Sequence, residues 1–396
     1  MARKGSNWRQ FEDDDDQFDR ISKMKPREKK FSRAAHLDEG FELAESSWLE
    51  KFPEGFAGRV VEVHKRYAFV SPEPEEGEIK TRDVWLSTIA RKFLQAKREQ
   101  RNFIVVGDRV LCVPTSEDNA GVVTDLPQCV IQRLAPRRTL IKRLDPHRKE
   151  MEHILASNVD QLLIVASYVG PNVKWGLIDR YLVLAELQGI KPLIVLNKRD
   201  LLTKEKSEFQ EDCAENIKIY EALGYSVFSV QANAPNARKN IDIQELKMTL
   251  KGKVSMLSGH SGVGKSSLVN LFEPELVQAV EKNEDIFYKG RHTTSYASFI
   301  KLGTGGYVID TPGIRSFVLQ ELSHRELAEG FLEFQDFLSG CKYPGCRHLE
   351  EPECAVRAAV TEGKISARRY GSYRGMLQGT TGREGRIRDV VTEENE

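Results

Sequence analysis

The sequence predicts a multidomain protein in which a small β-barrel of the OB type, an α/β domain and a helical zinc-binding domain follow one another. Short strand-like segments separated by turn residues run from residue 56 to residue 127, as in small barrels. From residue 159 onward apolar strand candidates alternate with helical ones, which implies a mainly parallel sheet covered on both faces. Beyond residue 322 the pattern is helical around a cluster of cysteines and a histidine.

These changes of pattern predict the domain boundaries. We expect a disordered tail at 1–50, the barrel at 51–135, the α/β domain at 136–320, the zinc-binding domain at 321–385 and a tail at 386–396.

The bulk composition is typical of a soluble protein with two or three domains. The 396 residues are 40% hydrophobic and 30% charged, and their formal net charge is zero. No apolar run reaches the roughly 18 residues of a membrane-spanning helix, and the N-terminus has no apolar signal segment. We therefore expect a cytoplasmic monomer with no membrane partner. Zero net charge neither requires nor excludes nucleic acid.

The first 50 residues show little apolar periodicity. An acidic run from Asp13 to Asp16 precedes the basic stretch KMKPREKKFSR at 23–33. Such a charged segment favours disorder, and folding on RNA is the alternative.

The predicted barrel strands alternate between apolar and polar residues. They are GRVVEVHKRYAFVSP at 58–72, which predicts a strand pair, DVWLSTI at 83–89, GDRVLCVP at 107–114 and GVVTDLP at 121–127.

Two basic stretches accompany the barrel. The first is a loop with five cations, Arg91, Lys92, Lys97, Arg98 and Arg101. Loops of OB barrels commonly bind nucleic acid, so we expect RNA contact here, with a merely solvated loop as the alternative. The second stretch, at 133–150, is predicted to be a linker.

The α/β domain is predicted from its apolar strands and the helices between them. One helix, at 177–189, is expected to end at Gly189, because glycine is favoured just after a helix. The strand candidates lie at 159–169, 191–198, 225–231, 253–259, 296–302 and 306–313.

The strongest chemical signal is the sequence GHSGVGKSS, which matches G-x-x-x-x-G-K-[ST] between a strand and a helix. The expected phosphate-binding residues are Gly259, His260, Ser261, Gly262, Val263, Gly264, Lys265, Ser266 and Ser267. The backbone N–H groups of such a loop surround phosphates, Lys265 contacts the β- and γ-phosphate oxygens, and Ser266 ligates Mg²⁺. A chance match is the alternative.

A second motif, N-K-R-D, follows the strand at 191–196 and consists of Asn197, Lys198, Arg199 and Asp200. The Asp200 carboxylate can accept two hydrogen bonds from guanine N1–H and the exocyclic amine, which adenine does not offer. The motif therefore favours GTP over ATP, although an ordinary charged loop is the alternative for four residues taken alone.

A third motif, D-T-P-G, consists of residues 310–313 and matches D-x-x-G. Asp310 is expected to hold Mg²⁺ through water, and the Gly313 N–H to sense the γ-phosphate. Upstream, Thr293 or Thr294 is expected to close on Mg²⁺ as part of a switch, with Thr294 favoured. Lys265, Thr294 and Gly313 are thus the candidate catalytic residues. A Pro-Gly turn and a polar hairpin loop are the respective alternatives.

The order of these motifs predicts a circularly permuted P-loop GTPase domain. Most GTPases place the phosphate loop first and N-K-x-D last, whereas here residue 197 precedes 259 and 310 comes last. Permutation preserves the sheet and relocates the termini. It leaves the D-T-P-G motif directly upstream of the C-terminal domain.

The C-terminal cluster consists of Cys341, Cys346, His348 and Cys354. Three thiolates and an imidazole complete a tetrahedral, structural Zn²⁺ site; reduced free thiols are the alternative. Downstream, Arg368, Arg369 and Arg374 alternate with Tyr370 and Tyr373. This pattern predicts either RNA stacking or an amphipathic helix packed on the zinc segment.

Together these residues resemble the circularly permuted, ribosome small-subunit-dependent GTPases of bacteria. The resemblance covers about residues 55–380. It implies an OB barrel, a permuted GTPase domain and a zinc domain. It also implies binding to the 30S subunit and its rRNA late in assembly, with GTP hydrolysis to GDP and phosphate linked to release.

Three positions depart from the expected patterns. Ile314 follows D-T-P-G where many GTPases carry a water-orienting glutamine, and Glu321 stands where the family often carries a histidine. His324 is nearby but out of register, so the water-orienting group is open. Residues 231–233, Gln-Ala-Asn, stand where Ser-Ala-Lys is common, and the backbone contact to guanine is expected to survive.

We expect slow hydrolysis by the free protein and stimulation by the small subunit. The rival hypothesis is an RNA-binding assembly module that is gated by nucleotide and hydrolyses little GTP. A third, an ATPase, is disfavoured by Asn197 and Asp200.

Overall fold

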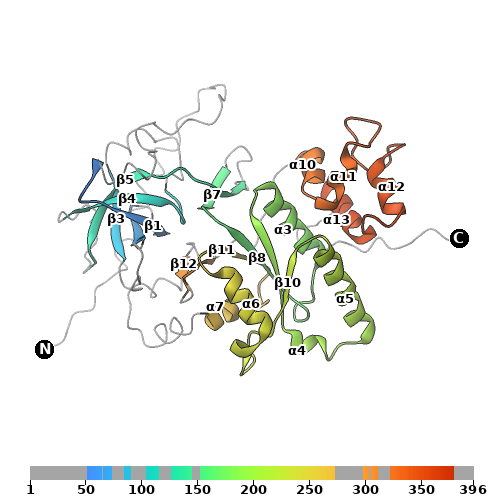
Figure 1. Cartoon of the computed structure of the whole chain (residues 1–396), viewed down its shortest axis with the longest axis horizontal. Coiled ribbons are helices and arrows are strands. Elements are labelled where there is room, and N and C mark those ends of the chain that lie inside the picture. Colours follow the sequence, from blue (N-terminus) through green and yellow to red (C-terminus); the bar gives the residue numbers. More distant parts are fainter. Residues whose placement is uncertain are drawn as a thin grey trace, which may run out of the picture. The chain divides into compact units, whose positions relative to one another are not determined.

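Five short strands close into an N-terminal barrel in the order β1-β2-β3-β5-β4 (Figure 1). The strands are β1 (Phe56–Val63), β2 (Ala68–Pro72), β3 (Trp85–Ile89), β4 (Arg109–Thr115) and β5 (Gln128–Leu134). Inward-pointing apolar residues such as Val60, Val70 and Ile131 are fully buried, as the alternation along each strand requires. The predicted OB-type barrel is confirmed.

The computed structural model describes residues 51–64, 66–73, 84–90, 104–115, 126–144, 152–272, 298–302, 305–310 and 322–378. All of them fall within one unit, Gly40–Glu396. The predicted tails at 1–50 and 386–396 and the basic loop at 91–101 lie outside the described residues.

Two sequence predictions near the barrel need correction. The fifth strand is β5, the segment QCVIQRL, and not GVVTDLP, whose residues 121–125 lie outside the described residues. The stretch at 133–150 is not simply a linker. It contains β6 (Leu140–Leu144), which pairs in antiparallel fashion with β7 (Glu152–Ser157). This hairpin forms because it buries Ile141 and Ala156 in the main apolar cluster.

The central sheet has six strands in the order β10-β9-β8-β11-β13-β12. They are β8 (Gln161–Ser167), β9 (Lys191–Asn197), β10 (Ser226–Ser229), β11 (Val254–Ser258), β12 (Ser298–Lys301) and β13 (Tyr307–Asp310). All neighbours are parallel except β12, which pairs antiparallel with β13. The predicted α/β domain is confirmed.

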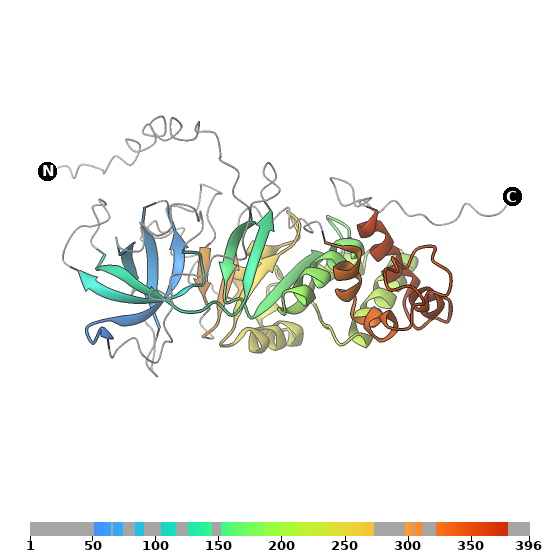
Figure 2. The same ribbon diagram turned by 90° about the horizontal axis from the view of Figure 1, so that it is seen from above.

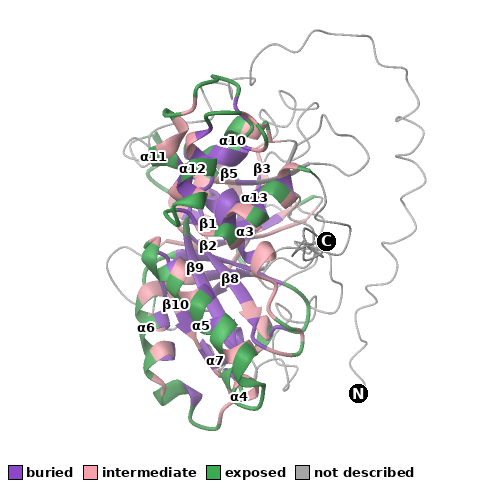
Figure 3. Ribbon diagram, turned by 90° about the vertical axis from the view of Figure 1, so that its right-hand side faces the viewer, coloured by how far each residue is buried: buried purple, intermediate pink, exposed green. Residues whose placement is uncertain are grey.

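Helices cover both faces of this sheet (Figure 1; Figure 2). One apolar cluster joins the sheet to α3 (Trp175–Leu187) and α5 (Ser207–Ala222). The other joins it to α6 (Ile241–Leu250) and α7 (Lys265–Phe272). In Figure 3 the strands β8 and β9 are buried, whereas α5 and α6 turn exposed faces outward. Helix α3 ends at Leu187, close to the predicted Gly189, whose φ of 63° is left-handed.

The C-terminal part is helical, as predicted. Its elements are α10 (His324–Glu329), η8 (Leu332–Phe334), α11 (Gln335–Leu338), α12 (Ala355–Thr361) and α13 (Ala367–Leu377). A third apolar cluster holds them together and includes Val183 of α3. Gly330 lies so close to α3 that an added Cβ would be 2.6 Å from Val183, which explains a small residue there.

The barrel is joined to the α/β domain through the start of β4 and the end of β7. The buried Asp108 carboxylate accepts hydrogen bonds from Arg137 at 2.7 Å and from the Ser157 hydroxyl at 2.6 Å. Asn158 donates to the Gly107 carbonyl at 3.0 Å. Gly107 has φ 93°, and a Cβ there would lie 2.1 Å from the Ser157 oxygen. Buried, satisfied polar groups of this kind fix one relative position of the segments they connect.

Candidate functional site

The nucleotide motifs meet at one edge of the central sheet, because their strands are parallel and end together. Strand β11 leads into the phosphate loop, residues 259–267, and β9 ends at Asn197. In the strand register Asp310 lies opposite Leu257, two residues before the loop, and Asn197 lies opposite Ser167. Motifs that are 113 residues apart at their extremes, from 197 to 310, are thus brought to one edge.

The phosphate loop requires glycine for two physical reasons. Gly259, Gly262 and Gly264 have φ values of 142°, 83° and 98°, which favour glycine. In addition, a Cβ on Gly259 would lie 2.0 Å from the Val165 carbonyl oxygen, and one on Gly264 would lie 2.2 Å from Asn197. The loop is therefore packed tightly against the neighbouring strands. Backbone N–H groups of such a glycine-rich loop are suited to surround an anion.

Lys265 is the first residue of α7, and its side chain folds back over the loop. Its ammonium donates to the carbonyls of Gly259 at 2.8 Å and His260 at 2.9 Å. The next residue, Ser266, is exposed, and Ser267 is half-buried. A cation and a hydroxyl at the N-terminus of a helix are the arrangement expected of a motif that binds phosphate and Mg²⁺.

Asn197 connects the guanine motif to the phosphate loop. Its side chain is 3% exposed, and its amide donates to the Val263 carbonyl at 3.0 Å. Its side-chain oxygen accepts from the Ala232 N–H, also at 3.0 Å. One buried amide thus holds the phosphate loop, N-K-R-D and the 231–233 segment in fixed relation. The predicted contact of this motif with guanine stays a prediction; the structure shows that Asn197 also has this positioning role.

The other residues of N-K-R-D separate in space. Lys198 is left-handed, with φ 62°, and its ammonium donates to the Gly170 carbonyl. Arg199 points to α6, where it lies 3.6 Å from Asp242. Asp200 is half-buried in the first turn of α4 (Arg199–Leu202). Half-buried Asp200 is the residue of this motif best placed to accept hydrogen bonds from a base.

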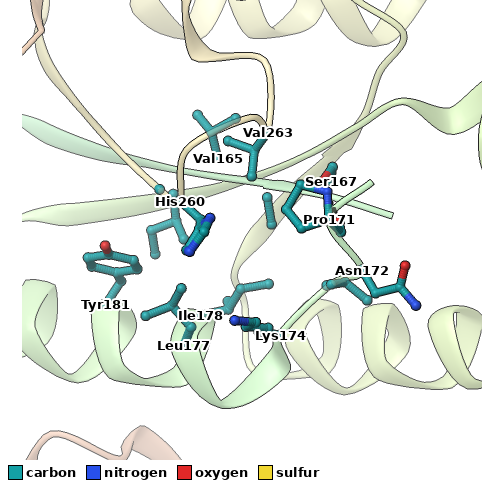
Figure 4. A pocket seen from close by; sticks show the side chains of 14 residues that line it. Val165, Ser167, Pro171, Asn172, Lys174, Leu177, Ile178, Tyr181, His260 and Val263 are labelled. Atoms are coloured by element: carbon teal, nitrogen blue, oxygen red, sulfur yellow. Dashed lines mark hydrogen bonds between the residues drawn. The ribbon is translucent and has the colours of Figure 1, made fainter. Parts of the chain in front are cut away.

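A small apolar hollow lies between the phosphate loop, the end of β8 and α3 (Figure 4). Val263 and His260 of the loop face Leu177, Ile178 and Tyr181 of α3 in this view. The His260 ring lies 3.0 Å from the Ser261 carbonyl. The His260 side chain therefore lies at the contact between the loop and α3. Of this residue, the backbone is the part predicted to bind phosphate.

Several candidate residues are not placed. Thr293, Thr294, Gly313, Ile314 and Glu321 lie outside the described residues. For Asp310 only the backbone is described, at the end of β13. His324 is described and begins α10, where it is half-buried.

The C-terminal cluster is assembled as predicted. The ligand atoms of Cys341, Cys346, His348 and Cys354 lie within 4.8 Å of one another. The Cys341 and Cys354 sulfurs are 3.9 Å apart, and His348 Nδ1 lies 3.5 Å and 3.4 Å from them. Tetrahedral Zn–S bonds of about 2.3 Å place two sulfurs about 3.8 Å apart. The four residues fit a metal ion.

Helix α13 decides between the two predictions made for its arginines and tyrosines. Arg369 and Tyr373 are 0% exposed, so the prediction that they stack on RNA is wrong and the packed helix is confirmed. Tyr370 and Tyr373 donate to the carbonyls of His348 and Arg347 at 2.6 Å and 2.7 Å. These bonds attach α13 to the metal-ligand loop.

Arg369 is held by two acids that the sequence interpretation missed. Its guanidinium donates to Asp179 of α3 at 2.8 Å and to Glu333 at 2.6 Å and 2.9 Å. Asp179 also accepts from Arg368 at 2.8 Å and from the Tyr220 hydroxyl at 2.7 Å. Burial alone would raise the pKa of Asp179, but the charges of Arg369 and Arg368 outweigh it and lower that pKa. The sequence did contain a signal for this ion pair: Asp179 lies among the apolar residues of α3, and a buried acid needs a partner.

Three comparisons with known proteins agree with this geometry. The model of the RsgA GTPase family matches residues 134–320. The small ribosomal subunit biogenesis GTPase RsgA of Shewanella oneidensis is 40% identical over 272 residues, 68% of this chain and 72% of the relative. The protein of the same name from Nitrosomonas europaea is 37% identical over 282 residues, 71% of this chain and 83% of the relative.

Two solved structures resemble the chain. YjeQ from Thermotoga maritima superposes with a TM-score of 0.62 and 32% identity, over 83% of this chain and 99% of that one. YloQ, a circularly permuted GTPase, gives a TM-score of 0.60 and 26% identity, over 84% and 97%. Among the helices described here, none combines the length and apolar character needed to cross a membrane.

Proposed function

This chain belongs to the RsgA GTPase family, and on that premise we propose that it hydrolyses GTP to GDP and phosphate while bound to a maturing small ribosomal subunit. The observation that carries the proposal is the Asn197 side chain. It connects the phosphate loop to the guanine motif through two buried hydrogen bonds. The phosphate loop and N-K-R-D must bind the two parts of one nucleotide, and this side chain holds them at a fixed distance from each other.

Guanine selection is assigned to Asp200 and triphosphate binding to residues 259–267. The Asp200 carboxylate accepts from the guanine N1–H and amine, and the loop N–H groups and Lys265 bind the phosphates. Ser266, Thr294 and Asp310 would hold Mg²⁺, which supplies charge neutralisation at the transferring phosphoryl group. Gly313 would contribute its N–H to the γ-phosphate. Half-burial of Asp200 and exposure of Ser266 support these roles.

The C-terminal metal is proposed to be one structural Zn²⁺. All four donors come from the protein, three are sulfur, and Cys346, His348 and Cys354 are buried. A site without an open position stabilises a fold and does no chemistry.

The partner is proposed to be the 30S subunit and its rRNA, with the protein acting as a cytoplasmic monomer. Support comes from the relatives, which are named small ribosomal subunit biogenesis GTPases, and from the barrel, a fold often used to bind nucleic acid. The basic loop at 91–101 is proposed to contribute. Residue 314 is isoleucine, which cannot orient the attacking water by hydrogen bonding. We propose that the bound subunit orders the switch loops and so stimulates hydrolysis.

The decisive experiment is steady-state GTP hydrolysis with and without small subunits, with ATP and large subunits as controls. We expect stimulation by small subunits only. Tight GTP binding without any stimulation would reject the proposal in favour of a nucleotide-gated RNA-binding module.

A matched pair of variants tests the guanine assignment. In xanthine a carbonyl replaces the guanine amine, so Asp200→Asn should lose GTP binding and gain xanthosine triphosphate binding. The same substitution at exposed Asp336 is the control. Unchanged GTP affinity in Asp200→Asn would reject the role of Asp200.

A further inference from the structure

The loop between Cys346 and Cys354 carries the histidine of the C-terminal cluster in a strained conformation. His348 is buried, and its backbone is left-handed, with φ 58°. A residue other than glycine rarely adopts this conformation, because its Cβ lies too close to the following carbonyl oxygen. The same conformation brings His348 Nδ1 to within 3.5 Å and 3.4 Å of the sulfurs of Cys341 and Cys354. Other contacts must therefore stabilise the backbone that presents this ring to a metal.

The Glu351 side chain supplies three of these contacts. Its carboxylate accepts hydrogen bonds from the backbone N–H groups of Arg347 and Leu349, both at 2.9 Å, and from that of Glu350 at 3.2 Å. One side chain thus binds the backbone on both sides of His348. Hydrogen bonds to an ionised carboxylate are roughly twice as strong as those between neutral groups.

Glu351 is ionised wherever the site can hold a metal. Burial alone would raise the pKa of Glu351, but the hydrogen bonds from backbone N–H groups outweigh burial and lower that pKa to about 2. Metal binding to thiol ligands requires their deprotonation, and protons compete with the metal well above this value. The carboxylate therefore keeps its charge, and its hold on the loop, at every pH at which the metal stays bound.

Tyr370 of α13 binds the same residue from the other side. Its hydroxyl donates to the His348 carbonyl at 2.6 Å. The N–H groups next to His348 are thus bound by Glu351, and its carbonyl is bound by Tyr370. Neither side chain belongs to the group of four described residues whose ligand atoms converge. Both therefore act on the ligand loop and leave the four donors to the metal.

We propose that Glu351 and Tyr370 are positioning residues that hold His348 in its left-handed conformation and so set how tightly the C-terminal metal is retained. The inference rests on the proposed function, in which this metal is one structural Zn²⁺. It extends the site from its four ligands to the side chains that orient one of them.

Release of metal from the full-length protein tests the inference. The protein is loaded with Zn²⁺, and transfer of the metal to an excess of a chelating dye is followed over time. Glu351→Gln replaces one carboxylate oxygen by an amide nitrogen, which cannot accept a hydrogen bond. It should release Zn²⁺ about tenfold faster, because loss of a group that orients a metal ligand usually costs 10–100-fold in affinity. Tyr370→Phe keeps the ring and loses one hydrogen bond, so it should accelerate release by a smaller factor.

Two matched variants serve as controls. Glu350→Gln removes the same charge from the next position, where the side chain is exposed. Ser323→Ala removes the cap of α10 and weakens the same helical segment away from the ligand loop. Both should release Zn²⁺ at the wild-type rate.

A spectrum distinguishes positioning from general stability. Co²⁺ in place of Zn²⁺ absorbs visible light in a way that depends on its coordination geometry. The bands should shift in Glu351→Gln, because the His348 ring is no longer held in one orientation, and should stay unchanged in both controls.

The possible results separate the two proposals. A wild-type protein that retains no Zn²⁺ overturns the structural metal and this inference with it. Bound Zn²⁺ that Glu351→Gln releases at the wild-type rate, or an unshifted Co²⁺ spectrum in that variant, overturns the positioning role alone. Equal acceleration by Ser323→Ala also overturns it, because release would then follow the stability of the whole segment.

Discussion

Two ion clusters have similar composition and different burial: one joins α3 to the C-terminal helices, and the other lies in the barrel. In the first, which we call the α3–α13 cluster, Asp179 and Arg369 are 0% exposed and Glu333 is 6% exposed. In the barrel cluster Arg59, Glu73 and Arg109 are 11%, 17% and 32% exposed. Fully buried charges tolerate only one arrangement, because losing a partner leaves an uncompensated charge. Partly exposed charges can exchange a partner for water.

This difference concerns the two clusters alone, because the barrel is also attached to the α/β domain through the buried Asp108 carboxylate. The C-terminal segment is fixed on α3, and α13 is fixed on the metal-ligand loop by Tyr370 and Tyr373. The Arg59 guanidinium of the barrel lies over Tyr307 of β13 and also donates to Gly107 and Glu73. The following experiments can break or sharpen this comparison, and they are ordered from the largest expected effect to the smallest.

Removal of the proposed Zn²⁺ should have the largest effect. Cys346 and Cys354 belong to the apolar cluster of the C-terminal segment, and binding of a structural zinc contributes roughly 10 kcal/mol. Chelation should abolish protection from hydrogen exchange in α12 and α13 and leave the barrel strands protected. Unchanged protection in α13 would show that the segment folds without metal.

Asp179→Asn should be the most destabilising single substitution of the two clusters. It leaves buried Arg369 and partly exposed Arg368 without their shared partner, which costs about 3–5 kcal/mol in the free energy of unfolding. Denaturant titration measures this loss, with Asp336→Asn on exposed α11 as the control. A loss equal to that of the control would contradict the idea of a fixed joint.

The pH dependence of Asp179 has a definite sign. Its pKa is lowered by folding, so it binds a proton less readily in the folded state. Its stabilising contribution is complete above the ordinary value of about 4 and is lost as the pH falls further. Asp179→Asn should therefore remove part of the acid sensitivity of unfolding.

Glu73→Gln should have a smaller effect, about 1 kcal/mol, because its cluster is partly exposed. Burial alone would raise the pKa of Glu73, but the hydrogen bond from Arg109 and the charges of both arginines lower it. Its contribution is thus also lost as the pH falls below about 4. Thermal unfolding at pH 7 and pH 3 would measure it; a loss as large as that of Asp179→Asn would remove the contrast between the clusters.

Ser323→Ala should have the smallest effect. The Ser323 hydroxyl caps α10 by accepting from the Glu326 N–H at 3.2 Å, and the Glu326 carboxylate accepts from the Ser323 N–H at 2.8 Å. Losing such a cap costs about 1 kcal/mol or less at an exposed position. A much larger loss in denaturant titration would mean that α10 contributes more to the C-terminal joint than its packing indicates.

The nucleotide edge could be predicted from sequence because its signals are local. Gly259, Gly264 and Lys265 belong to one nine-residue motif, and the strand before it and the helix after it have clear periodicities. The cysteine cluster was predicted for the same reason. The local geometry of such a site restricts the residue types at each position. The motif can therefore be recognised in the sequence without knowledge of which distant residues contact it.

Contacts between distant residues could not be predicted in this way. Arg369 and Asp179 are 190 residues apart, and an arginine beside tyrosines has the same local pattern whether it is buried or binds RNA. Strand β5 was missed because its partners are distant in sequence or joined by a long connection: it pairs in parallel with β3, about 40 residues earlier, and antiparallel with β4 with no short turn between them. Strand β6 was missed because basic residues mask the alternation of Leu140–Leu144.

The permuted order also has a mechanical consequence. Along the chain, β8 is the first strand of the central sheet and β13 is the last, and both pair in parallel with β11, which leads into the phosphate loop. Tension between the barrel and the C-terminal segment would pull β8 and β13 in opposite directions along their axes. The load would fall in shear on the hydrogen bonds on both sides of β11, all at once rather than one after another. Strand β11, which leads into the predicted phosphate loop, is therefore the element on which such a pull would act most directly.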